Sequence, residues 1–149
     1  MNDTEKQLLK IIADMDGTPA GAYNIRANGS SWIGMTGTRK GFVEFDTREH
    51  GIRAWLVLMR TYRRKHDCAT IRKIVERFAP PAENDTERYI RFCDLQTGLG
   101  AETRLMFNAD YCYLGAAMAK METGTVVRPS DIQKVMEKFN IYPVGYGQI

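Results

Sequence analysis

The chain has 149 residues, of which 44% are hydrophobic and 26% are charged. That balance is typical of a globular protein with one sizeable core, and we expect residues 1–149 to form a single domain. The formal net charge of +3 is too small to indicate a nucleic-acid partner, so none is predicted.

The pattern of cysteines and histidines disfavours metal and disulfide chemistry. The three cysteines, Cys68, Cys93 and Cys112, are far apart and show no CxxC spacing. The two histidines, His50 and His66, have no ligand partner at a useful spacing. The sequence also contains no Walker loop and no dinucleotide-binding glycine pattern. We therefore predict no metal site and no cofactor.

The first 17 residues, MNDTEKQLLKIIADMDG, do not have the pattern of a signal peptide. Acidic residues come first, and Lys10 and Asp14 interrupt the apolar run. No stretch approaches the ~20 apolar residues that a membrane-spanning helix needs, so no membrane span is predicted.

The predicted elements begin with a helix over Thr4–Ala13, followed by a loop rich in glycine, alanine, serine and asparagine. Two short extended runs, Ser31–Met35 and Gly41–Phe45, lie on either side of the sequence TGTRK and predict one small hairpin.

Asp46 and Glu49 then have the spacing of a capping box. They predict the start of a helix that ends near residue 64. Its apolar residues recur every three or four positions and place it at the centre of the core: Ile52, Trp55, Leu56, Met59 and Tyr62.

Apolar periodicity between capping residues, prolines and glycines predicts four further helices: Thr70–Phe78, Asn84 or Asp85 to Thr97, Asn108 or Asp110 to Glu122, and Ser130–Phe139. The tail, residues 140–149, is expected to be loose or engaged with a partner. One hairpin among many helices predicts an α+β fold that is mostly α, with the sheet to one side.

Carboxylates are the candidates for chemistry that remain. Glycan cleavage needs a carboxylic acid with a raised pKa and often a second carboxylate. Glu49 stands where the hairpin leads into the following helix, and Glu83 lies in the turn PPAEND. Asp14, Asp16, Glu44 and Asp85 lie at similar junctions. Each of these side chains also has a structural interpretation as a turn or cap residue. The aromatic residues near the polar loop, Tyr23, Trp32 and Phe42, are candidates either for a sugar-stacking surface or for the core.

Four segments together resemble a group of bacteriophage and prophage proteins. They are NIR (24–26), W-x-G-x-x-G (32–37), GFVEFDTREHGIRAW (41–55) and TIRKIVERFAPPAENDTERYI (70–90). The group usually has NPGNIR where this chain has AGAYNIR, and a tryptophan where this chain has Phe78. Its members are often described as phage structural (virion) proteins. The resemblance covers roughly residues 22–98, and APPAENDTERYI is its most specific part.

The layout also resembles the lysozyme-like peptidoglycan hydrolases of the glucosaminidase and transglycosylase kind. In those enzymes a helix with a catalytic glutamate precedes an asparagine-rich loop, a glycine-flanked tryptophan, and an aromatic segment that enters a helix. The position after the first helix here offers Asp14 and Asp16 instead of glutamate. The likeness implies a lysozyme-like helical domain with one small hairpin.

Three functions are compatible with these resemblances. The first is a phage-derived, virion-associated protein that binds peptidoglycan or other phage structural proteins without turnover. The second is a peptidoglycan glycosidase or lytic transglycosylase in which Glu49 or Glu83 is the acid, and Asn24, Trp32 and Asn84 hold the sugar. The third is an inhibitor that binds a host protein. Each implies a location in the virion or in the host cytoplasm, and the sequence leaves the oligomeric state open.

Overall fold

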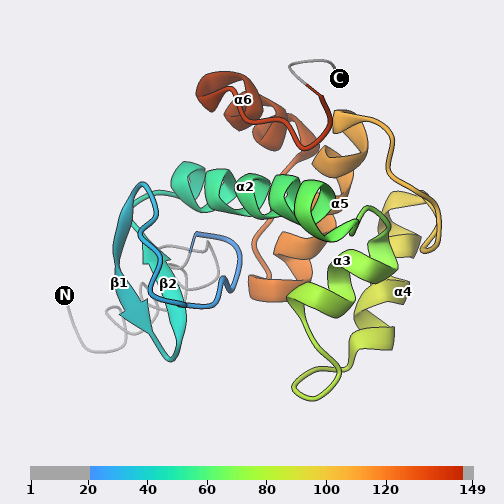
Figure 1. Cartoon of the computed structure of the whole chain (residues 1–149), viewed down its shortest axis with the longest axis horizontal. Helices are drawn as coiled ribbons and strands as arrows, with labels where there is room; N and C mark the ends of the chain where they lie inside the picture. The colour runs from blue at the N-terminus through green and yellow to red at the C-terminus, as the bar shows by residue number, and fades with distance from the viewer. Residues whose placement is uncertain (1–20, 146–149) are drawn as a thin grey trace, which may run out of the picture.

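The structure, a computed structural model, describes residues 21–145. Within that range it contains five helices and one two-stranded antiparallel sheet, which confirms the predicted α+β, mostly α class (Figure 1). The helix predicted over Thr4–Ala13 and the candidate acids Asp14 and Asp16 lie outside the described residues.

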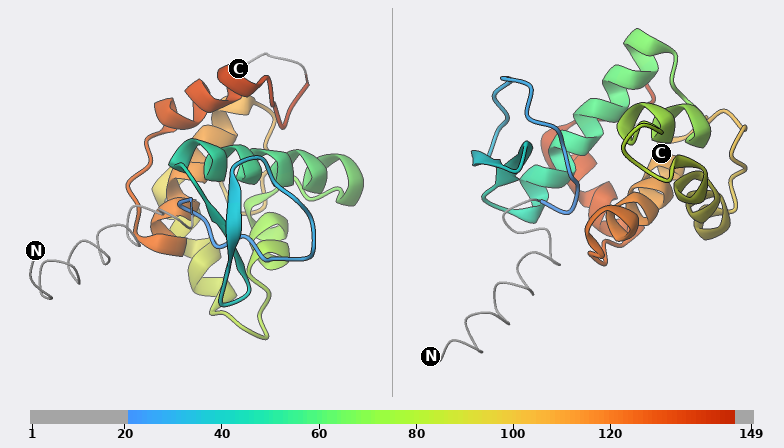
Figure 2. Two further views of the ribbon diagram at one scale, coloured as in Figure 1. Left: turned by 90° about the vertical axis from the view of Figure 1, so that its left-hand side faces the viewer. Right: turned by 90° about the horizontal axis from the view of Figure 1, so that it is seen from below.

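The hairpin lies on one side of the molecule and the helices α3 and α4 on the other, and α2 runs between the two sides (Figure 1). The right-hand view in Figure 2 shows the same separation. Helix α6 packs on α2 and α5, and α4 packs on α5 and α3. In chain order the elements are β1 (Met35–Arg39), β2 (Phe42–Phe45), α2 (Arg48–His66), α3 (Ile71–Phe78), α4 (Thr86–Thr97), α5 (Asn108–Thr123) and α6 (Pro129–Phe139).

The predicted central helix is confirmed as α2, and all five of its predicted core residues are buried. Its start differs from the expected capping box. Thr47 is the N-cap, and its hydroxyl accepts a hydrogen bond from the backbone N–H of His50 at 3.2 Å. Asp46 lies one residue earlier, and its carboxylate is 2.6 Å from the Nδ1 atom of His50. Both residues can cap a helix, so a sequence that places Asp and Thr side by side does not define the cap to one residue.

The hairpin exists, but its first strand begins later than predicted. Strand β1 contains most of TGTRK, the segment that was expected to be a loop. The turn is the two-residue Lys40–Gly41, in which both residues have positive φ angles of 52° and 84°. Such a turn matches the twist of paired strands. The predicted start at Ser31 was wrong, because β1 begins at Met35. Strand β1 is largely exposed, so its polar side chains do not hinder its pairing with β2.

A buried tyrosine joins the chain before the hairpin to the helices. The ring of Tyr23 stacks on that of Trp55 in α2, with 5.3 Å between centroids and 13° between planes. The Tyr23 hydroxyl donates a hydrogen bond to the backbone carbonyl of Gly115 in α5 at 2.8 Å. Gly115 leaves no room for a side chain, because an added Cβ would lie 2.8 Å from the Trp55 ring and 2.4 Å from Ile132 of α6. Three helices and the loop therefore meet at this point.

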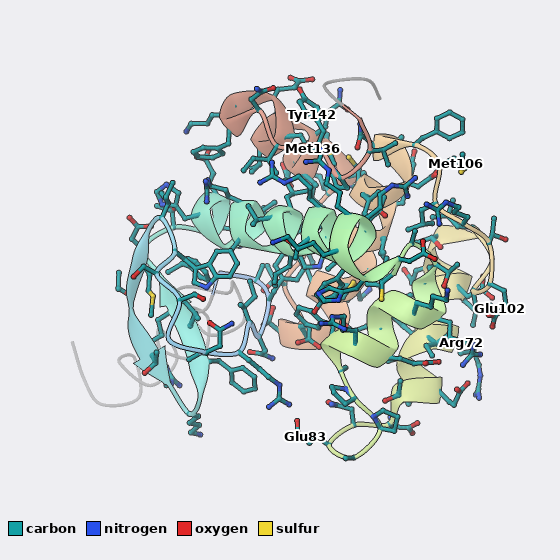
Figure 3. The ribbon with its side chains drawn as sticks, in the orientation of Figure 1. Arg72, Glu83, Glu102, Met106, Met136 and Tyr142 are labelled. Carbon is teal, nitrogen blue, oxygen red and sulfur yellow. The ribbon has the colours of Figure 1, made fainter. Side chains whose placement is uncertain are left out.

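The helices α3 and α4 are tied together on their outer side by Arg72. Its guanidinium contacts Glu87 of α4 at 2.6 Å and Glu102 of the following loop at 2.5 Å. Figure 3 shows Arg72 and Glu102 on the side of these helices that faces away from the hairpin. This arrangement leaves the opposite face of α3 and the α3–α4 connection directed toward the hairpin.

The tail was expected to be loose or engaged with a partner, whereas residues 141–144 pack against the domain itself. Ile141 and Pro143 are buried. The side-chain amide of Asn108 donates to the Val144 carbonyl at 2.8 Å and accepts from the Val144 N–H at 2.8 Å. A side-chain amide that both donates and accepts in this way satisfies the backbone N–H and carbonyl groups of one residue, as a neighbouring strand would.

We expect Gly115→Ala to lower the free energy of unfolding, because the added methyl group must displace the Trp55 ring or Ile132. Overpacking of this kind costs roughly 1–3 kcal/mol. The measurement is urea unfolding followed by circular dichroism. The control is Gly37→Ala, since an added Cβ there meets nothing within 4 Å. Equal stability of the two variants would contradict the packing described for Gly115.

Candidate functional site

An open groove lies between the hairpin side of the molecule and the α3–α4 connection. It consists of two adjoining hollows with volumes of about 430 Å³ and about 500 Å³. Asn24, Arg26 and Phe78 line both hollows and form their shared wall. We call the first hollow the Glu122 half and the second the Trp32 half, after a residue that lines each.

Glu122 is a carboxyl group in the groove with a strongly raised pKa. Burial raises its pKa to about 7 from an ordinary 4.5, and the neighbouring Tyr89 hydroxyl and Asn24 offset only part of that effect. The residue occupies the last turn of α5. Because the C-terminal end of a helix carries partial negative charge, the helix also disfavours the ionised form. Glu122 can therefore hold a proton near neutral pH.

Tyr89 of α4 provides a buried hydroxyl beside this carboxyl group. The residue is 4% exposed and lines the Glu122 half. Its hydroxyl lies near enough to lower the pKa of Glu122, yet it completes no well-formed hydrogen bond within residues 21–145. The Tyr89 hydroxyl therefore acts on the neighbouring Glu122 carboxyl group, whose pKa it lowers below the value that burial alone would give.

The loop before the hairpin positions the end of α5. The Asn24 amide donates to the backbone carbonyl of Glu122 at 3.1 Å, and the Thr123 hydroxyl donates to the Ala22 carbonyl at 3.0 Å. Tyr23 lies between these two contacts and is anchored to Gly115. Residues 22–24 are thus fastened to the last turns of α5, which fixes Asn24 beside Glu122.

Four of the five site residues predicted from the sequence come together in this groove. Asn24 lines both halves, Trp32 lines the Trp32 half, and Glu83 and Asn84 line the Glu122 half. Glu83 lies on the α3–α4 connection, where Figure 3 labels it, and forms an ion pair with Arg26. Their roles in binding or catalysis remain predictions.

Glu49, the fifth predicted residue, lies elsewhere. It is exposed in the first turn of α2, and its Oε2 atom is 2.6 Å from the Nζ atom of Lys138 in α6. It lines neither half of the groove. This position gives Glu49 a structural contact between two helices and does not favour the catalytic role predicted for it.

Glu122 was not among the site residues predicted from the sequence, although a signal for it was present. The segment that forms α5 contains three charged residues, Asp110, Lys120 and Glu122, and its other side chains are largely small or apolar. A helix without a polar face is buried on most sides. A glutamate at the C-terminal end of such a helix also opposes the helix dipole, so its retention there requires a reason.

Within the described part of the chain, no group of three or more histidine, cysteine, aspartate and glutamate side chains is arranged to hold a metal ion. Among the helices of residues 21–145, none has the length and apolar character needed to cross a membrane.

The chain is similar to a bacteriophage protein. It is 42% identical over 84 residues to Protein P5 of Pseudoalteromonas phage PM2. The match covers 56% of this chain and 52% of the phage protein, so the chain spans about half the length of the relative. No family model matches the chain.

The raised pKa of Glu122 predicts that this residue lowers stability at alkaline pH. The folded protein binds the proton more tightly than the unfolded chain, so this group reduces the free energy of unfolding as pH rises from 4.5 to 7. Above pH 7 the reduction in the free energy of unfolding is on the order of 3 kcal/mol. We therefore expect Glu122→Gln to be more stable than the parent at pH 8, and to lose most of that advantage at pH 4.

The measurement is chemical unfolding at both pH values, and Glu137→Gln is the matched control because Glu137 is an exposed carboxylate on α6. If Glu122→Gln changed stability equally at both pH values, the raised pKa would be contradicted.

Proposed function

We propose that the chain forms a single lysozyme-like domain of phage origin that binds the glycan strand of peptidoglycan in the groove and cleaves it. Glu122 is the general acid. The observation that carries the proposal is a carboxyl group with a pKa of about 7 that lines an open groove. Glycosidases need a carboxylic acid that is still protonated near neutral pH, and burial is the usual means of obtaining one.

In the proposed reaction, protonated Glu122 donates its proton to the oxygen of the glycosidic bond. The bond between that oxygen and the anomeric carbon then breaks, the electron pair stays with the departing sugar, and positive charge develops on the remaining ring. The ring needs a negative group or an activated nucleophile on its other face. Glu83 and Asp85 line the same half of the groove and are the candidates. Glu83 forms an ion pair with Arg26.

The other residues of the groove suit a sugar chain. Trp32 in one half and Phe42 in the other offer aromatic surfaces for sugar rings, and Phe78 lines both. The amides of Asn24 and Asn84 supply hydrogen-bonding groups near Glu122. An open groove made of two adjoining hollows accommodates a polymer better than a small molecule, which usually needs an enclosed cavity.

The similarity to a phage protein supports peptidoglycan as the substrate, because a phage must cross the bacterial wall. We place the protein either in the virion or in the host cytoplasm.

A second candidate function is wall binding without turnover, as a virion-associated protein. The Arg26–Glu83 ion pair favours it, because a neutralised carboxylate is a weaker nucleophile or base.

We expect the purified protein to release dye from labelled peptidoglycan, and Glu122→Gln to slow that release by about 100-fold or more, as for the loss of a general acid. The activity of the parent should fall as pH rises through about 7, because Glu122 then loses its proton. Glu49→Gln should keep the parent activity.

An active Glu122→Gln variant would contradict the assignment of the acid. A folded parent that sedimented with peptidoglycan but released no dye would support wall binding without turnover instead.

A further inference from the structure

The two halves of the groove differ in charge. Three carboxyl groups line the Glu122 half, those of Glu83, Asp85 and Glu122, together with two arginines. The Trp32 half has no carboxyl group among its lining residues. It has two arginines, Arg26 and Arg77, and His66. A ligand that lies along the whole groove therefore meets carboxyl groups only in the Glu122 half, whereas it meets arginines in both halves.

Arg77 is the cation of the Trp32 half that has no carboxylate partner. It lies in the last turn of α3, with its Nη2 atom 3.1 Å from the Nε2 atom of His66. A guanidinium can only donate, so the His66 nitrogen accepts this hydrogen bond. The Cζ atom of Arg77 is 5.4 Å from the centre of the Tyr62 ring. Within residues 21–145 Arg77 forms no ion pair.

These contacts hold a positive charge in one place without neutralising it. His66 and the Tyr62 ring restrict the side chain, and neither is an anion. Arginine recognises carboxylates with two parallel N–H groups, and a side chain that is already positioned loses less freedom when it binds. Trp32 and Phe78 line the same hollow and offer apolar surface next to the charge. The combination suits a carboxylate attached to a sugar ring.

We propose that the Trp32 half is the subsite for the carboxylate-bearing sugar of the glycan strand, with Arg77 as its partner. This inference rests on the proposed function. Alternate sugars of peptidoglycan carry a lactyl group that is extended by a peptide with free carboxylates, whereas chitin carries no charge. The subsite therefore makes the protein selective for peptidoglycan over uncharged polymers of N-acetylglucosamine, and it places the charged sugar at a fixed distance from Glu122.

The carboxyl groups of the Glu122 half argue against a polyanion such as nucleic acid as the occupant. A phosphate backbone needs a continuous basic surface, and in this hollow carboxyl groups lie among the arginines, with Glu83 paired to Arg26. A single anionic substituent on an otherwise neutral strand needs no such continuous surface.

The test measures binding by the change in tryptophan fluorescence, in a Glu122→Gln background that prevents turnover. Three tetrasaccharides are compared: a peptidoglycan fragment with its peptides, the same fragment with only the lactyl carboxylates after peptide removal, and chitotetraose. We expect at least one of the two charged ligands to bind about 10-fold more tightly than chitotetraose. The charged ligand with the higher affinity identifies which carboxylate Arg77 contacts.

Arg77→Gln should remove that preference and leave the affinity for chitotetraose unchanged. Arg77→Lys should keep part of the preference, because it retains the charge and loses the paired N–H groups. Lys73→Gln is the matched control, since Lys73 lies on the same helix, is exposed and does not line the groove.

Equal affinity for all three ligands, or a preference that survived in Arg77→Gln, would overturn the subsite and leave the proposed function standing. Failure of the folded protein to bind any of the three would overturn both.

Discussion

The stacking of Tyr23 on Trp55, with the Tyr23 hydroxyl bonded to the Gly115 carbonyl, is the interaction on which the site depends. It fixes an irregular loop against the two central helices, and both aromatic rings are fully buried. The next residue, Asn24, is thereby placed against the backbone of Glu122. A loop attached only by exposed contacts would not hold an amide at a defined position beside a carboxyl group.

This arrangement stabilises the fold while it leaves Glu122 in an unfavourable environment. The carboxyl group is desolvated and lies at the negative end of a helix. The Tyr89 hydroxyl offsets only part of the resulting rise in its pKa. A site that served packing alone would favour a glutamine or an apolar residue at this position. Retention of a destabilising group within a groove is typical of functional sites.

Much of the fold could be predicted from local sequence patterns. The period of apolar residues predicted α2 and its core positions, and Thr70 and Asp85 proved to be the caps of α3 and α4. The start of β1 could not be predicted in the same way, because an exposed strand has no apolar alternation to mark it. The docking of residues 141–144 on Asn108 depends on contacts between distant segments, which no local pattern records.

The candidate site was predictable only in part, for a similar reason. Asn24, Trp32, Glu83 and Asn84 were selected from segments that the fold brings to one groove. Glu49 was selected for its place between two elements, and the fold turns it toward Lys138 instead. Glu122 acquires its character from burial by α4 and the Asn24 loop, and these neighbours are distant in the sequence.

The most direct test of the central claim is a site-specific titration of the Glu122 carboxyl group by carbon-13 NMR in the folded protein. The Glu122→Gln variant assigns the resonance. The account predicts a titration midpoint near pH 7. A midpoint near 4.5, the ordinary value for glutamate, would show that Glu122 is ionised at neutral pH and would contradict its role as the acid of the groove.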